Sequence, residues 1–135
     1  MTPNETTGFL SGVVEGFYGQ PWTRAERLAL FDTMAGLGLQ TYCYAAKDDP
    51  HHRACWREPY PEADARELSV LTDAAAARGI RFVYAIGPGL DIRYTRDADL
   101  DALRARIAQM LALGCRDVAL LFDDVPDGLA AEDRD

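Results

Sequence analysis

The sequence predicts an α/β fold: a TIM (β/α)8 barrel of which this chain supplies about the first half, β-α-β-α-β-α-β. Strand-like apolar segments alternate with segments of helical periodicity, and the predicted strands begin roughly 30 to 40 residues apart, the period of parallel βαβ units. Polar, acidic or glycine-rich residues follow each predicted strand, whereas the connections from helix to strand are short and plain. Because barrel active sites lie at the carboxyl ends of the strands, this asymmetry favours a barrel over a doubly wound sheet and locates its site.

The first part of the chain predicts two strands and one helix. Residues 9–14 form the first apolar strand, and residues 41–45, rich in aromatic and β-branched side chains, form the second. Between them, Thr23 and Glu26 have the spacing of a capping box, in which the two residues satisfy each other's backbone donors at the start of a helix. We expect Gly36 and Gly38 to end this helix. Four apolar residues recur at helical spacing and are predicted to face the sheet: Leu28, Phe31, Met34 and Ala35.

The second part predicts two further helices and two strands. A helix over residues 64–77 stops at Gly79 and is followed by a strand over 80–86. A glycine-proline loop, 87–89, leads to a helix over 97–113 that Gly114 caps, and residues 118–122 form the fourth strand. The predicted inward residues are Leu68, Leu71 and Ala75 on the first of these helices and Leu100, Leu103, Ile107 and Met110 on the second.

Composition limits the classes of function. The net charge of −8 and the pI near 4.7 argue against a nucleic-acid partner, because no basic stripe is present to neutralise phosphates. No apolar stretch approaches ~20 residues and the first seven residues do not form a signal peptide, so we predict a cytoplasmic protein without a membrane partner. Cys43, Cys55 and Cys115 form no CxxC pair and are interpreted as small hydrophobic residues. We divide the chain into a tail, residues 1–8, and one partial barrel domain, residues 9–135.

Two adjacent carboxylates, Asp123 and Asp124, follow the fourth predicted strand directly. Neighbouring side chains of a strand point to opposite faces, so these two can share one pocket only because the strand breaks into a loop there. Two carboxylates held close do not both ionise easily, so one of them is expected to keep a raised pKa and act as a general acid. The alternative is an ordinary solvated turn, since the segment is rich in turn-forming residues.

The loops after the first two strands hold the other candidates. Lys47 stands where a strand ends and could donate to a ligand; a salt-bridged structural loop is the alternative, and Asp48 and Asp49 with the next two histidines could suggest a metal. Against a metal, adjacent histidines diverge and no third spaced ligand is evident. After the first strand, Gly16 and Gly19 flank Phe17 and Tyr18, so backbone could approach a ligand and aromatic faces could stack on a sugar, although such clusters are also typical of cores. The segment does not match a phosphate-binding loop.

Taken together, these segments resemble glycoside hydrolase family 84, the O-GlcNAcases and bacterial hyaluronidase-like β-N-acetylglucosaminidases. The resemblance spans residues 9 to 125. It rests on five blocks in order: VVEGFYGQPW (13–22), TYCYAAKDDP (41–50), WREPY (56–60), FVYAIGPGLDI (82–92) and ALLFDD (119–124).

The resemblance implies retaining hydrolysis of terminal β-linked GlcNAc from a glycoside or glycoprotein, assisted by the substrate's own acetamido group and needing no cofactor or metal. Asp123 would accept a hydrogen bond from the acetamido N–H, and Asp124 would act as general acid and then general base. Gly16, through its backbone carbonyl, and Lys47 would bind sugar hydroxyls, and Tyr18 would line the pocket.

Two positions depart from the family pattern, Gln20 in place of a common arginine and Gly87 in place of a common serine. The family's other sugar-binding residues come from strands beyond the fourth, and a full barrel needs ~250 residues. We therefore expect open sheet edges that self-associate or bind a complementing C-terminal half-barrel. The alternatives are a non-catalytic half-barrel with weak or no sugar binding and a metal-assisted barrel enzyme.

Overall fold

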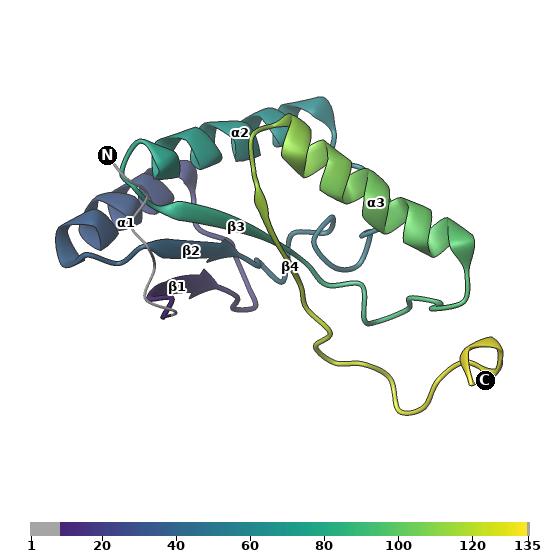
Figure 1. Ribbon diagram of the computed structural model, residues 1–135. Coiled ribbons are helices and arrows are strands. Elements are labelled where there is room, and N and C mark those ends of the chain that lie inside the picture. Colours follow the sequence, from purple (N-terminus) through teal and green to yellow (C-terminus); the bar gives the residue numbers. More distant parts are fainter. Residues whose placement is uncertain (1–8, 135) are drawn as a thin grey trace.

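The computed structural model describes residues 9–134, which form one sheet with three helices packed on it (Figure 1). The predicted tail, residues 1–8, lies outside the described residues. The elements are β1 (Gly12–Glu15), α1 (Arg24–Leu37), β2 (Thr41–Tyr44), α2 (Glu62–Ala76), β3 (Arg81–Ile86), α3 (Asp97–Ala112), β4 (Asp117–Leu120) and a short 3-10 turn (Ala131–Asp133). The predicted order of strands and helices is confirmed.

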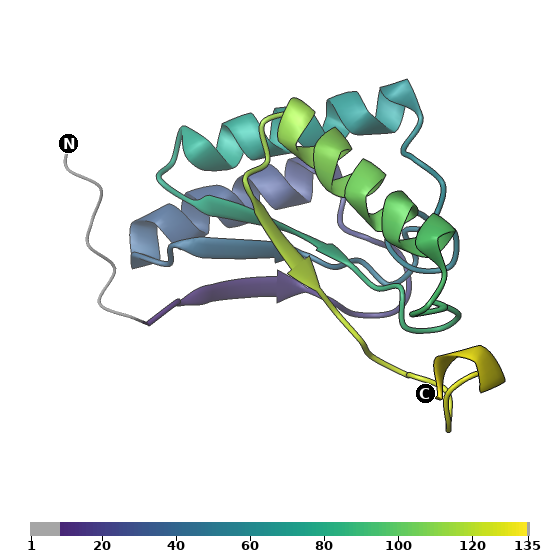
Figure 2. The ribbon, with the colours of Figure 1, turned by 45° about the vertical axis from the view of Figure 1, so that its right-hand side comes forward.

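The four strands are parallel and lie in the order β1-β2-β3-β4. All three helices cover the same face of this sheet, which leaves the other face without a helix (Figure 2). A doubly wound sheet reverses its strand order at a switch point and carries helices on both faces. Consecutive strands with helices on one side are instead the arrangement of a barrel segment, so the predicted half-barrel is confirmed.

The core lies between the sheet and the helices. Its buried side chains include Phe31 and Met34 of α1, Leu71 and Ala75 of α2, and Met110 of α3, and Leu68 and Leu103 are also buried as predicted. The sheet contributes Tyr42, Tyr44, Phe82, Tyr84 and Ile86 to this core.

The prediction was wrong for Ala35 and Leu100, which are exposed, and Leu28 and Ile107 are only partly buried. On α3 the polar residues Asp99 and Arg106 are buried instead. Asp99 and Arg106 are held in the interior by hydrogen bonds, where the helical spacing predicted apolar contacts of Leu100 and Ile107.

Three predicted boundaries were wrong. β1 begins at Gly12 rather than at residue 9: its register with β2 starts at Gly12 and Thr41, and before it the carbonyl of Ser11 accepts from the N–H groups of Gln40 and Thr41. Gly36 lies inside α1; Gly38 ends the helix with φ of 74° and bonds to the carbonyls of the last turn, while the Thr23–Glu26 capping box at the start is present as predicted. β4 ends at Leu120 rather than at residue 122: the N–H of Leu121 still donates to the carbonyl of Ile86, the last residue of β3, and the strand register stops there.

Within residues 9–134, none of the helices has both the length and the apolar character that crossing a membrane requires.

Candidate active site

The carboxylate pair lies where the chain leaves β4, and each carboxylate has its own cation. Lys47 forms an ion pair with Asp123. Arg53 donates from Nη2 to Oδ2 of Asp124 at 2.6 Å, and the hydroxyl of Tyr18 donates to the same oxygen at 2.8 Å. Residues that follow β1, β2 and β4 therefore meet at the carboxyl edge of the sheet, as the sequence predicted.

Asp123 and Asp124 both contact the loop between β2 and α2 because the backbone adopts a left-handed conformation at Asp124. Asp124 has φ of 51°, the left-handed conformation that few residues other than glycine adopt, although aspartate tolerates it better than most. This turn brings the side chain of Asp124 to the side that Asp123 already faces, toward the loop between β2 and α2. The solvated-turn alternative has a turn-like backbone in its favour, but the structure gives both side chains specific cationic partners.

The electrostatics of Asp124 differ from the expectation. The hydrogen bond from Tyr18 lowers its pKa most, and the positive charges of Arg53 and Lys47 lower it further, against a smaller rise from desolvation. The raised pKa expected for one carboxylate of the pair is therefore wrong for Asp124, because the phenol of Tyr18 and the positive charges of Arg53 and Lys47 favour its ionised form. In this arrangement Asp124 is an ionised acceptor at neutral pH.

The loop that carries Lys47 and Arg53 is anchored to the core by hydrogen bonds to the end of β3 and to α3. His52 is buried, and its Nδ1–H donates to the carbonyl of Ala85 at 2.6 Å, while its own carbonyl accepts from the N–H of Gly87 at 2.8 Å. Burial lowers the pKa of His52, so the ring is neutral and serves as a structural link to the end of β3. Arg106 of α3 donates to the carbonyl of His51 at 2.5 Å, and also to the carbonyls of Trp56 and Glu58.

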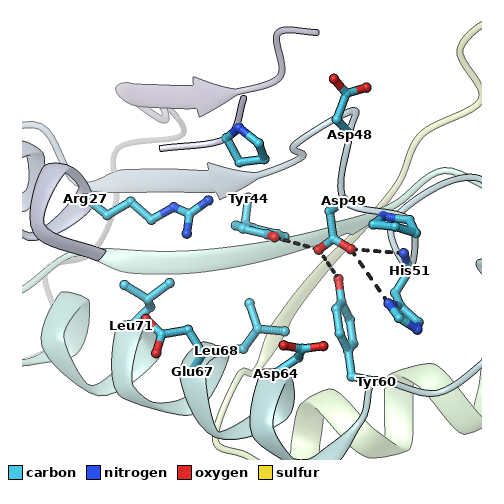
Figure 3. Close-up of a pocket in the computed structure, with 12 residues that line it drawn as sticks. Arg27, Tyr44, Asp48, Asp49, His51, Tyr60, Asp64, Glu67, Leu68 and Leu71 are labelled. Carbon is cyan, nitrogen blue, oxygen red and sulfur yellow. Dashed lines mark hydrogen bonds and ion pairs between the residues drawn. The ribbon is translucent and has the colours of Figure 1, made fainter. Parts of the chain in front are cut away.

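Asp49 lies in a pocket on the helix side of β2, separate from the carboxylate pair. Its Oδ2 accepts from the hydroxyls of Tyr44 and Tyr60, both at 2.6 Å, and its Oδ1 accepts from the N–H of His51 at 2.9 Å (Figure 3). The pocket around them has a volume of about 380 Å³ between the sheet, α1 and α2, away from the carboxylate pair. Asp49 thus braces the inside of the loop and does not point to the carboxylates.

The residues considered for a metal site, Asp48, Asp49 and the two histidines, do not converge on one point in the described part of the chain. Asp48 accepts from the N–H of Gly19 at 2.7 Å, and the rings of His51 and His52 diverge, toward Tyr60 and Ala85 respectively. Among residues 9–134, no three His, Cys, Asp or Glu side chains gather in a way that could hold a metal ion.

A buried ion pair sets the end of β1, directly before Gly16. Glu15 is fully buried and accepts from Nε and Nη2 of Arg27, at 2.8 and 2.7 Å, and from the hydroxyl of Tyr42 at 2.5 Å. This network fixes the strand end from which the Tyr18 loop departs. Gly16 itself makes no hydrogen bond to the other predicted site residues within the described chain.

Comparisons with known proteins identify the family of the chain. The family model described as β-N-acetylglucosaminidase (NAGidase) matches residues 11–135. The chain belongs to this β-N-acetylglucosaminidase family, glycoside hydrolase family 84. It is similar to the protein O-GlcNAcases of Rattus norvegicus and Mus musculus, each 45% identical over 127 residues, which cover 94% of this chain and 14% of the relative. An aspartate-to-asparagine mutant of the Thermobaculum terrenum O-GlcNAc hydrolase is a solved structure at 40% identity and a TM-score of 0.89, covering 93% of this chain and 27% of that one.

The chain thus spans a small part of these family members, and its match lies in their barrel fold. Of the residues predicted for a family 84 site, the structure joins Tyr18, Lys47, Asp123 and Asp124 through direct contacts. Sequence reasoning missed Arg53, although it lies in the same loop as Lys47. A signal was present, because Lys47 and Arg53 are two cations in the one loop that follows β2, and two adjacent carboxylates follow β4.

Proposed function

We propose that this chain forms the first half of the catalytic barrel of a β-N-acetylglucosaminidase that removes terminal β-linked GlcNAc from O-GlcNAc-type glycosides or glycoproteins. The observation that carries the proposal is the pair Asp123–Asp124 at the end of β4, with a separate cationic partner for each carboxylate. The similar proteins are an O-GlcNAcase and an O-GlcNAc hydrolase, which supports the substrate class.

The proposed reaction retains the anomeric configuration and uses the substrate as nucleophile. The carbonyl oxygen of the 2-acetamido group attacks the anomeric carbon, the bond to the leaving oxygen breaks, and an oxazoline forms. Asp123 accepts a hydrogen bond from the acetamido N–H and so orients and polarises that group. Lys47 forms an ion pair with this carboxylate.

Asp124 takes the second role in this proposal. It gives a proton to the leaving oxygen and then removes one from the water that opens the oxazoline. Its environment favours the ionised form, which suits the second step, and the first step requires that the carboxylate has already taken up a proton from solvent. The backbone carbonyl of Gly16 and the ammonium of Lys47 bind sugar hydroxyls, and Tyr18 lines the pocket.

Hydrolysis of 4-nitrophenyl β-GlcNAc tests the proposal. We expect release of nitrophenol by the wild type and its loss in Asp124→Ala, while Asp127→Ala, a change of an exposed aspartate three residues further on, leaves the rate unchanged. Replacing the acetamido group of the substrate by trifluoroacetamido should slow the reaction, because the carbonyl oxygen becomes a poorer nucleophile. If neither the wild type nor Asp124→Ala releases nitrophenol, activity of this chain is refuted and a non-catalytic half-barrel is favoured.

We further propose that the chain self-associates or binds a complementing half-barrel. Within the described residues β1 pairs only with β2 and β4 only with β3, so each has a free edge. Val14 is 64% exposed beside one edge and Leu120 is 48% exposed at the other. Free apolar edges of this kind pair readily with another chain. The cytoplasmic location stays a prediction.

A further inference from the structure

One oxygen of Asp124 collects all of the hydrogen bonds that reach this carboxylate from residues 9–134. Oδ2 accepts from Arg53 Nη2 and from the Tyr18 hydroxyl. Arg53 Nη1 in turn donates to the Tyr18 hydroxyl oxygen at 3.1 Å, and its guanidinium lies 5.5 Å from the centre of the Tyr18 ring. The three groups close a triangle. Because the phenol oxygen accepts from Arg53, its single proton is directed at Asp124.

The position of Arg53 is set by the core and not by Asp124. The side chain of Arg53 is 15% exposed, whereas that of Asp124 is 57% exposed. The residue before Arg53, His52, is tied through its ring and its carbonyl to the end of β3, and Arg106 holds the carbonyl of His51. The Arg53 guanidinium is therefore held in place by the core. The Asp124 carboxylate, which lies on a left-handed turn, is positioned by its contact with Arg53.

We propose that Arg53 is a positioning residue for Asp124, holding Oδ2 together with Tyr18 so that Oδ1 is left for the substrate. This inference rests on the acid/base role proposed for Asp124. A guanidinium fork suits the task because two of its nitrogens serve two acceptors at once, the carboxylate and the phenol. Arg53 also stabilises the carboxylate form, which favours the step in which Asp124 acts as base.

The test follows the titration of the Asp124 carboxyl by ¹³C NMR in the 135-residue chain, with the resonance assigned by its absence in Asp124→Asn. In Arg53→Gln we expect the midpoint to move to higher pH, by a change of about threefold to tenfold in proton affinity, because a partly exposed charge contact is lost. Arg57→Gln is the matched control. Arg57 lies in the same loop but binds Asp91 and Asp99, so its loss should leave the Asp124 midpoint unchanged. A shift in Arg53→Gln no larger than in Arg57→Gln would overturn the proposal.

Arg53→Lys keeps the experiment decisive where Arg53→Gln does not fold. Lysine retains the charge but lacks the two-nitrogen fork, so we expect a midpoint above that of the wild type and, where the glutamine variant folds, below the glutamine value. A midpoint equal to the wild type would refute the role of the fork.

The titration needs no hydrolysis, so the two proposals fail separately. If the midpoint shifts but the chain does not hydrolyse β-GlcNAc, the proposed activity is refuted and the contact between Arg53 and Asp124 is supported. Hydrolysis without a shifted midpoint removes the positioning role alone. Where hydrolysis is present, the basic limb of kcat/KM should move to higher pH in Arg53→Gln, because the protonated Asp124 that donates to the leaving oxygen then persists to a higher pH.

Discussion

Replacing Arg27 by Met should destabilise this fold far more than the same change at Arg24, three residues earlier on the same helix. Arg27 is 7% exposed and gives two hydrogen bonds to Glu15, which is fully buried. Without the guanidinium, the Glu15 carboxylate stays in the core with only the Tyr42 hydroxyl. Removing one partner of a buried pair costs about 3–5 kcal/mol. The side chains of the Arg24–Glu67 pair are 53% and 35% exposed, so solvent screens the pair and its loss should cost much less.

Urea unfolding at pH 7, followed by circular dichroism, measures the free energy of unfolding of both variants. The double variant Glu15→Gln/Arg27→Met adds a second criterion. It should be more stable than Arg27→Met alone, because a neutral amide costs less to bury than an unpaired carboxylate. A stabilising role of the buried Glu15–Arg27 pair is refuted where Arg27→Met loses no more stability than Arg24→Met, or where the double variant is less stable than Arg27→Met.

Contacts elsewhere in the molecule determine the effects of acid, of two glycine substitutions and of a charge at the sheet edge. Hydrogen bonds from Arg57 lower the pKa of Asp99 to about 2 from 3.8, so its stabilisation is complete above about pH 4 and is lost as the pH falls through about 2. Asp99→Asn should remove about 2 kcal/mol of that acid dependence, measured by urea unfolding at several pH values, and an unchanged pH profile would contradict the assignment. Gly36→Ala should stabilise α1 by about 0.5–1 kcal/mol, whereas Gly12→Ala should cost more than about 2 kcal/mol because the new Cβ would lie 1.7 Å from the carbonyl oxygen of Thr41. Val14→Lys should shift the chain toward monomer in light scattering, and an unchanged mass would argue against association through this edge.

The sequence predicted those features that depend on local chemistry. The Thr23–Glu26 pair is a short-range signal, and the structure contains that capping box. Apolar spacing predicted Phe31 and Met110 correctly because a helix on a sheet must bury one stripe. The position of Asp123 at a strand end followed from chain order alone, since parallel strands all end at the same edge of the sheet.

What the sequence could not predict depends on partners distant along the chain. Arg106 reads as a surface residue of an amphipathic helix, yet it is buried because three backbone carbonyls and the Tyr84 hydroxyl accept its protons. The pKa direction of Asp124 was missed for a similar reason. Adjacent carboxylates are visible in the sequence, whereas Arg53 and Tyr18 reach Asp124 from other loops.

The contacts of the carboxylate pair have a consequence for the order of folding. Tyr18 and Asp124 are 106 residues apart along the chain, Lys47 and Asp123 are 76 apart, and Arg53 and Asp124 are 71 apart. The strands, by contrast, pair with their neighbours in chain order, so the sheet can grow one βα unit at a time. Since distant contacts carry the larger loop-closure cost, we expect the pair to form last, with φ-values near zero for Asp124→Asn and higher values for changes between β2 and β3. During synthesis, three strands and two helices could then pack on one another while Asp124 is still to be translated.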